Sequence, residues 1–407
     1  MTNRKYPLEG LKVVELATVV AAPTAGRLLS DFGADVIKVE SKGGDLLRGV
    51  GVGLALPMEE DNNPIFDIFN SGKRLVSINL KTDGGMRLMK ELLAQADIFI
   101  SNVRMPSLKK MKLDYDSIKE EFPELVYGHF SGFGLEGEGA GDPGFDTTAF
   151  WVRSGAMLDG VVDGDFPYRP SYGFGDIATS GYFLSGMLMA LRARDQGMGG
   201  SFVSTSLMSG GMWHNIAHLV NSQEKYGRKY PLERYEPWSP TVDYYMCKDE
   251  KWLCVAGKYY PDDRPVFAEL MDMPELMTDP DLASLDKMSA SGKTSQVARK
   301  IQEKMKEKAS DEWIKIFKER DIPVEPMGHF KDAVYDPQAA ANGYVEEFDY
   351  GDGEPTKIPV PPMKIYGFDR KPFTQEGKVG AQSAEVLKEL GYSDEEIEKF
   401  KKEGYID

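Results

Sequence analysis

The feature that most constrains the fold is a regular alternation of short β-branched runs with helical stretches, which begins at Leu11. This alternation is typical of parallel α/β architecture, because each helix carries the chain back to the edge of the sheet where the next strand starts. The expected strands cover residues 11–16, 35–39, 75–80, 97–101, 125–130 and 202–207, and the expected helices include 24–32, 84–95 and 181–191. We therefore predict a doubly wound parallel sheet.

The length of 407 residues predicts more than one domain, because a single hydrophobic core stops growing at roughly 250–300 residues. We expect a large α/β domain over residues 1–222 and a smaller α+β domain over 223–342, which contains a hairpin and a charged amphipathic segment. Residues 343–407 are expected to form a Pro-rich connector and C-terminal helices that return to the large domain. The last helix should begin at Ser393, which has Glu396 in capping-box spacing.

The net charge of −16 disfavours nucleic acid and anionic membranes as partners, so an anionic ligand needs a local basic pocket. No apolar run approaches the roughly 18 residues of a membrane span, and residues 1–10 lack an apolar signal core. We therefore expect a cytoplasmic protein. Cys247 and Cys254 are too few for a disulfide framework or a zinc site, and we expect buried thiols and no metal.

Two motifs with a known chemistry lack the context that this chemistry needs. Gly132, Gly134 and Gly137 form a GxGxxG after an expected strand, but the Gly- and Pro-containing run 138–143 follows where a helix would have to bind a pyrophosphate. A nicotinamide or flavin site is therefore not expected. His214 and His218 lie four residues apart on an expected helix without a glutamate base between them, so we interpret them as packing residues.

A single acid, Asp146, stands in the glycine-rich segment 141–150, between Phe145 and a helical run. A carboxylate has an ordinary pKa of about 3.9, so it is ionised near neutral pH and can attack a thioester without a separate base. An aspartate at this position would serve equally well as a helix N-cap. The residues alone leave both roles open.

Several motifs occur in the same order over nearly the whole chain as in one known family. They are GLKVVEL (10–16), the run 22–27, FGADVIKVE (32–40), NSGKR (70–74), NLK (79–81), ADI (96–98), GFG (132–134), GFD (144–146), PPMK (361–364) and VLKELGY (386–392). On these motifs the sequence resembles the class III CoA-transferases, the family of formyl-CoA, carnitine and 2-hydroxyacyl-CoA transferases. The runs 63–67 and 143–147 are most similar to the 2-hydroxyacyl-CoA transferases of amino-acid-fermenting anaerobes.

The resemblance implies that CoA moves from an acyl-CoA, such as a 2-hydroxyacyl- or enoyl-CoA, to a free acid such as (R)-2-hydroxyisocaproate. Asp146 matches the family nucleophile, which forms a mixed anhydride and then an aspartyl-CoA thioester. Acyl-CoA is a substrate here, and no tightly bound cofactor is expected. The resemblance also implies an interlocked homodimer.

The CoA-binding positions of the family fall on a defined set of residues, which contains four basic side chains that suit the phosphates of CoA. They are Val20, Lys42, Lys81, Asn102, Val103, Arg104, Lys110, Ser131 and Gly132. Lys73 and Arg74 are interpreted as structural charges. The mobile glycine run that covers the site in formyl-CoA transferases corresponds to residues 256–261, which contain one glycine and two tyrosines, so a bulkier, aromatic-walled acyl pocket is expected.

Two alternatives remain. A related branch racemises 2-methylacyl-CoA with a histidine and an aspartate, but Phe145 occupies the histidine position, and an aromatic hydrocarbon exchanges no proton. The partner acid of that branch would match Asp176, which we otherwise interpret as a structural or substrate-orienting residue. A non-catalytic acyl-CoA-binding protein on the same fold is the second alternative.

Overall fold

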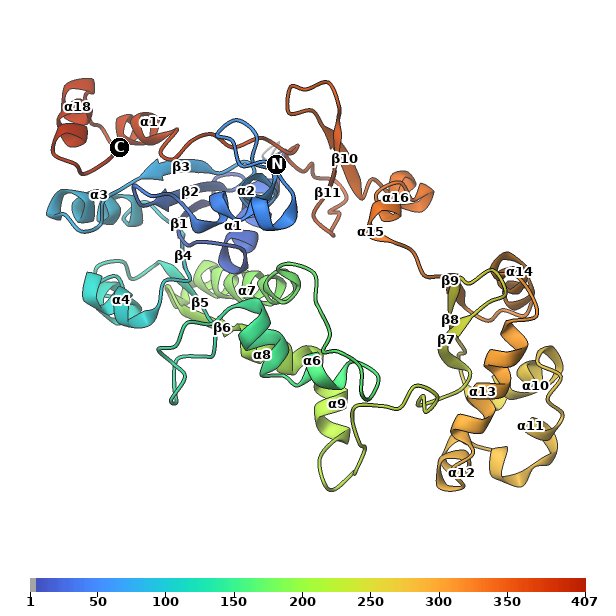
Figure 1. Cartoon of the computed structure of the whole chain (residues 1–407). Coiled ribbons are helices and arrows are strands. Elements are labelled where there is room, and N and C mark those ends of the chain that lie inside the picture. Colours follow the sequence, from blue (N-terminus) through green and yellow to red (C-terminus); the bar gives the residue numbers. More distant parts are fainter. Residues whose placement is uncertain (1–4) are drawn as a thin grey trace. The chain divides into compact units, whose positions relative to one another are not determined.

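The computed structural model describes residues 5–407 and forms two compact units (Figure 1). The first unit contains the chain up to Met157 together with Arg169–Val220 and Pro337–Asp407. The second unit contains Leu158–Tyr168 and Asn221–Asp336. Each unit has its own hydrophobic core.

The first unit is built on a six-stranded sheet with the order β3-β2-β1-β4-β5-β6, in which all neighbouring strands are parallel (Figure 1). The order reverses between β1 and β4, as in doubly wound folds, which confirms the predicted class. The strands are β1 (Lys12–Leu16), β2 (Asp35–Glu40), β3 (Arg74–Ser77), β4 (Ile98–Ser101), β5 (Val126–Ser131) and β6 (Phe202–Ser206).

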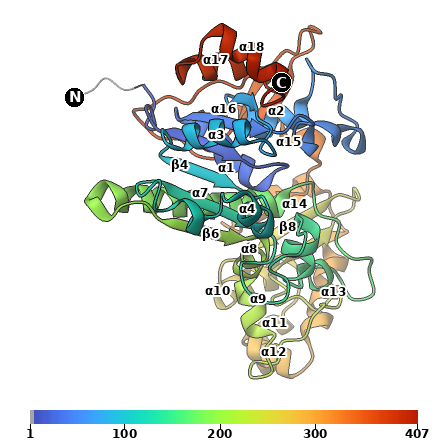
Figure 2. The same ribbon diagram turned by 90° about the vertical axis from the view of Figure 1, so that its left-hand side faces the viewer.

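Helices cover both faces of this sheet (Figure 2), because successive residues of each strand point to opposite sides. Val13 of β1 packs on the face covered by α1 (Ala21–Asp31) and α7 (Phe174–Ala193). Val14 packs on the other face, which is covered by the helices α3 (Asp83–Leu93), α4 (Met105–Met111), α17 (Ser383–Glu389) and α18 (Asp394–Lys402). The C-terminal helices therefore return to the large unit, and Ser393 and Glu396 form the predicted capping box.

The remaining elements of the first unit are short. They are the helices α2 (Pro64–Asn70), α5 (Tyr115–Ile118), α8 (Leu207–His214) and α16 (Pro337–Asn342), the hairpin of β10 (Val345–Phe348) and β11 (Thr356–Pro359), 3-10 turns at Leu46–Gly49 and Gly51–Leu54, and π-helical turns at Asp146–Val152 and Arg194–Met198. Helices α6 (Ala156–Asp159) and α9 (Ile216–Asn221) cross the boundaries of the units.

The second unit contains a three-stranded antiparallel sheet in the order β7-β8-β9. Its elements are β7 (Val242–Met246), β8 (Trp252–Ala256), β9 (Val324–Pro326), α10 (Tyr260–Leu270), α11 (Glu275–Thr278), a 3-10 turn (Pro280–Leu282), α12 (Leu285–Ala290), α13 (Thr294–Met305), α14 (Ser310–Glu319) and α15 (Phe330–Ala333). Both cysteines are free thiols: Cys247 follows β7 and is buried, and Cys254 lies in β8 and is half-buried.

Four local predictions were wrong. The expected strand 75–80 ends at Ser77, and the expected helix 181–191 begins already at Phe174. Helix α1 begins at Ala21 rather than Thr24, because Pro23 is accepted in the first turn of a helix. His214 and His218 do not share a helix, since α8 ends at His214, where Asn215 leaves the helical conformation and α9 then begins.

Candidate active site

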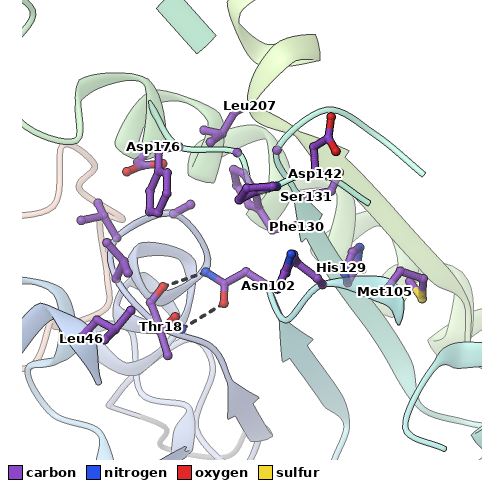
Figure 3. Close-up of a pocket in the computed structure, with 18 of the residues that line it drawn as sticks. Thr18, Leu46, Asn102, Met105, His129, Phe130, Ser131, Asp142, Asp176 and Leu207 are labelled. Carbon is purple, nitrogen blue, oxygen red and sulfur yellow. Dashed lines mark hydrogen bonds between the residues drawn. The ribbon is translucent and has the colours of Figure 1, made fainter. Parts of the chain in front are cut away.

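A cavity of about 220 Å³ lies at the carboxyl ends of the parallel strands, at the point where the strand order reverses (Figure 3). Ligands bind at this place in doubly wound folds because neighbouring loops diverge there. The lining residues all belong to the first unit. They are Thr18, Val19, Val20, Ala21, Leu46, Asn102, Arg104, Met105, His129, Phe130, Ser131, Gly132, Ala140, Asp142, Pro143, Gly144, Phe145, Asp176 and Leu207.

The turn between β1 and α1 forms one wall of this cavity and is held in a strained conformation. Val19 has φ +67°, a left-handed backbone that β-branched residues seldom adopt. Its N–H donates to Oδ1 of Asp45 at 2.9 Å. The Asn102 side chain accepts from the Thr18 N–H at 3.0 Å and donates to the Thr18 carbonyl oxygen at 2.7 Å (Figure 3). The Asn102 amide is therefore engaged within the protein.

A buried ionic network lies beneath this turn. Nζ of Lys38 lies 3.1 Å from Glu15 and 2.9 Å from Asp45, and Nζ of Lys73 lies 2.8 Å from Glu15. All four side chains are fully buried, so each charge depends on its partners. Burial lowers the pKa of Lys73 to about 8, against the attraction of Glu15. The interpretation of Lys73 as a structural charge is confirmed.

The two acids of interest meet at the N-terminus of α7. Gly173 precedes this helix and has no side chain that could cap it. Oδ1 of Asp146 instead accepts the backbone N–H of Asp176 at 3.1 Å, and the N–H of Gly175 also stabilises this carboxylate. Asp146 thus caps α7 from 30 residues away in the chain, which satisfies donors that every helix leaves free in its first turn.

Gly175 permits this arrangement because a Cβ atom there would lie 2.4 Å from Oδ1 of Asp146. Asp176, in the first turn of α7, lines the cavity, whereas Asp146 is not among the lining residues. Both acids are 8% exposed. Of the two acids, Asp176 is therefore the one that borders the cavity.

Both carboxyl groups titrate above the ordinary range. Burial raises the pKa of Asp146, while the N–H groups of Gly175 and Asp176 oppose this change. Burial, together with the nearby charge of Asp146, raises the pKa of Asp176 to about 7. Near neutral pH the pair therefore carries a proton that is easily lost, a feature typical of acids at functional sites.

The first glycine of the GxGxxG segment has a packing role. A Cβ atom on Gly132 would lie 2.6 Å from the Cα atom of Gly144, so the loop after β5 and the loop before Asp146 approach closely at these two residues. No helix follows Gly137, where the structure has turns and loop up to Asp146. The prediction that no helix follows this segment is confirmed.

The structure distributes the predicted CoA residues over two cavities. Val20, Asn102, Arg104, Ser131 and Gly132 line the first cavity. Lys42, Lys81 and Val103 line a second cavity of about 560 Å³ beside the ends of β2 and β3, and Lys110 lines neither. Thr18 lines both cavities.

Sequence reasoning interpreted Asp176 only as a structural or substrate-orienting residue and gave His129 no role. Asp176 follows a Gly-Phe-Gly run that opens the longest helix, and this position at a helix N-terminus was the available signal. His129 lies near the carboxyl end of the buried strand β5 and gave no signal before its neighbours were known.

Within residues 5–407, no cluster of three or more His, Cys, Asp or Glu side chains has the arrangement of a metal site. No helix in the same range is long and apolar enough to cross a membrane.

Comparison with known proteins identifies the class. The model of CoA-transferase family III matches residues 8–382, and the chain therefore belongs to this family. It is a class III CoA-transferase, an enzyme that transfers CoA to a carboxylic acid.

Among its relatives are an (R)-2-hydroxy-4-methylpentanoate CoA-transferase of Clostridioides difficile and a cinnamoyl-CoA:phenyllactate CoA-transferase of Clostridium sporogenes. The first is 34% identical over 97% of this chain and 98% of its own length, and the second is 33% identical over 99% and 98%. A solved CaiB/BaiF family structure from Brucella suis is 26% identical, with a TM-score of 0.77 over 95% of this chain and 100% of its own.

Proposed function

We propose that the protein moves CoA between an acyl-CoA and a free 2-hydroxy acid with a branched or aromatic side chain. The names of the two clostridial relatives support this substrate class. Phe145, which lines the cavity and is 55% exposed, supports an apolar acyl group. The observation that carries the proposal is the Asp176 carboxyl group in a cavity at the switch point of the sheet.

Two carboxylates are candidates for the nucleophile. Asp146 is the candidate from the sequence, and the geometry favours Asp176. Oδ1 of Asp146 is occupied by backbone N–H groups of α7, whereas Asp176 lines the cavity that a thioester would enter. We therefore propose Asp176 as the attacking group and Asp146 as the residue that positions it, with the opposite assignment as the alternative.

The proposed reaction needs no oxidant, reductant or metal. An ionised aspartate oxygen attacks the thioester carbonyl carbon, the C–S bond breaks, and CoA leaves as a thiolate with the electron pair. The thiolate then attacks the aspartyl carbonyl of the mixed anhydride and releases the acyl group as a free carboxylate. The incoming acid reverses these two steps on the aspartyl-CoA thioester. Backbone N–H groups of the glycine-rich loops are the proposed donors to the tetrahedral oxygens.

CoA is the proposed diffusible substrate, and no tightly bound cofactor is included. Lys42 and Lys81 in the second cavity and Arg104 in the first cavity are the proposed partners of its phosphates. Their positive charge suits the 3'-phosphate and the pyrophosphate of CoA in a chain of net charge −16. Val20, Asn102, Val103, Lys110, Ser131 and Gly132 complete the proposed contacts.

A cytoplasmic homodimer is the proposed working form. Helix α7 carries apolar side chains on its solvent side, including Ile177 at 46%, Leu188 at 37% and Met189 at 70% exposure. Apolar residues around the whole circumference of a helix are typical of a helix that a further element covers. Sedimentation of the full chain tests this proposal, and a monomer at micromolar concentration would contradict it.

The test of function is acyl exchange with trapping of the intermediate. The protein is incubated with a panel of acyl-CoA thioesters and free 2-hydroxy acids, hydroxylamine captures the activated aspartate, and mass spectrometry locates the hydroxamate. CoA on a new acid together with a hydroxamate at Asp176 supports both parts of the proposal. A hydroxamate at Asp146 would assign that residue as the nucleophile.

The alternatives predict other products. Deuterium entering the α-carbon of a 2-methylacyl-CoA without exchange would indicate a racemase. CoA binding with neither reaction would indicate a non-catalytic acyl-CoA-binding protein.

A further inference from the structure

His129 is a buried cavity residue with an unused hydrogen-bond acceptor. It lies near the carboxyl end of β5, is 2% exposed, and lines the first cavity beside Met105 (Figure 3). Its Nε2 atom lies 3.0 Å from the carbonyl oxygen of Val103. Among the residues that the structure describes, no group pairs with its buried Nδ1 atom.

The tautomer of this ring follows from its contact. A carbonyl oxygen only accepts, so Nε2 must carry the hydrogen in the bond to Val103. Burial lowers the pKa of His129, which keeps the ring neutral at physiological pH. Nδ1 is then a bare lone pair, and a buried polar atom without a partner costs about 1–3 kcal/mol. A ligand with an N–H or O–H group would recover this cost.

The neighbouring polar groups of the cavity are already engaged. The Asn102 amide is bonded on both sides to Thr18. Oγ of Ser131 donates to the Thr205 carbonyl oxygen at 3.1 Å and accepts from the Gly134 N–H at 3.1 Å. His129 thus offers an acceptor that these neighbours do not.

We propose that Nδ1 of His129 accepts a hydrogen bond from an amide N–H of the pantetheine arm of a bound acyl-CoA. The assignment rests on the proposed function. Asp176 and His129 lie on different sides of the cavity, with Asn102 between them (Figure 3). With the thioester carbonyl at Asp176, the arm that extends from the sulfur carries its amide groups past Asn102 toward His129. The hydrogen bond would fix the depth to which the thioester enters.

A matched pair of variants separates ligand binding from a structural role. In H129Q the side-chain amide keeps the donor to Val103 and loses the acceptor. In H129N the amide oxygen takes the position of Nδ1, while the donor to Val103 is lost. Dissociation constants of butanoyl-CoA and 2-hydroxy-4-methylpentanoyl-CoA are measured by calorimetry for the wild type and both variants.

We expect H129Q to lower the affinity for both thioesters about three- to tenfold, the usual effect of one hydrogen bond. The affinities of H129N should stay within about twofold of those of the wild type. Unchanged affinity in H129Q, or an equal loss in H129N, would overturn the proposal. A loss confined to the hydroxylated thioester would overturn it in favour of the 2-hydroxyl group as the donor.

A second measurement needs no variant. The chain has four histidines, so the Nδ1 resonance of His129 can be followed in ¹⁵N-histidine-labelled wild-type protein during titration with CoA. An upfield shift toward a hydrogen-bonded nitrogen is expected, and an unmoved resonance under saturating CoA would refute the proposal. A wild-type protein that binds no CoA thioester would instead refute the proposed function itself.

Discussion

Replacing Asp146 separates its two effects on Asp176, which are the cap on α7 and the negative charge. D146N keeps an oxygen that accepts the N–H groups of Gly175 and Asp176 but removes the charge. D146A removes both. Since loss of a helix cap costs about 0.5–2 kcal/mol, we expect D146A to destabilise the large unit by this amount and D146N to cost less.

The negative charge of Asp146 can be tested separately, through the pH dependence of exchange. Because burial and the charge of Asp146 together raise the pKa of Asp176 to about 7, removing that charge must lower it. An ionised Asp176 is the proposed attacking form, so kcat/KM of the wild type should rise with pH through an apparent pKa near 7. In D146N this rise should move to lower pH, with transfer activity retained.

The assays are urea titration of each variant and pH profiles of kcat/KM for CoA exchange, with D176N as the matched control. We expect D176N to fold and to lose exchange. The reasoning would be refuted if D146N abolished exchange while D176N retained it, because Asp146 would then be the nucleophile. A wild-type profile that is flat between pH 5 and pH 8 would refute the assignment of the pKa.

Three further predictions concern packing and charge. G175A adds a Cβ atom 2.4 Å from Oδ1 of Asp146, so it should destabilise the protein by about 1–3 kcal/mol and slow exchange. The control is G181A on the same helix, where a Cβ atom meets open space, and it should be neutral or stabilising by up to about 1 kcal/mol. Thermal melting of both variants measures these changes. K38M leaves the buried Glu15 with one cation fewer and should cost about 3–5 kcal/mol in urea titrations. D176N should stabilise the protein at pH 8 but not at pH 4. The folded pKa of Asp176, about 7, lies above its ordinary value of about 3.9, so ionisation of Asp176 lowers the stability of the wild type as pH rises from about 4 to about 7, by at most about 4 kcal/mol. An equal effect of D176N on the free energy of unfolding at the two pH values would contradict this.

The parallel sheet could be predicted because its signal is local. Each buried strand is a short β-branched run, and a helical pattern follows it in the sequence. The bounds of β1, β2, β4 and β5 therefore lie within one or two residues of the expected ones. The capping box at Ser393 was predictable for the same reason, since both partners lie within one turn. The end of α8 was not, because Asn215 and the residues after it carry no strong helix-breaking signal.

The site itself depends on contacts between distant residues. Asp146 lies 30 residues before the N–H group that it accepts, and no spacing rule connects the two. The glycine-rich turn made Asp146 conspicuous, but the choice between the roles of nucleophile and helix cap could not be made without the position of α7. His129 depends on the backbone of Val103, 26 residues away, for its tautomer.

The pairing of the two acids has a physical rationale that joins these observations. A carboxylate nucleophile in a cavity must be charged to react, but its buried charge destabilises the protein when no substrate is bound. The N-terminus of α7 offers two N–H groups that favour negative charge, and Asp146 takes them. Asp176 is left with a carboxyl group whose pKa lies close to physiological pH. Asp176 can therefore lose its proton to water while the cavity is open, before a thioester enters, whereas its neutral form avoids the cost of burying two negative charges side by side.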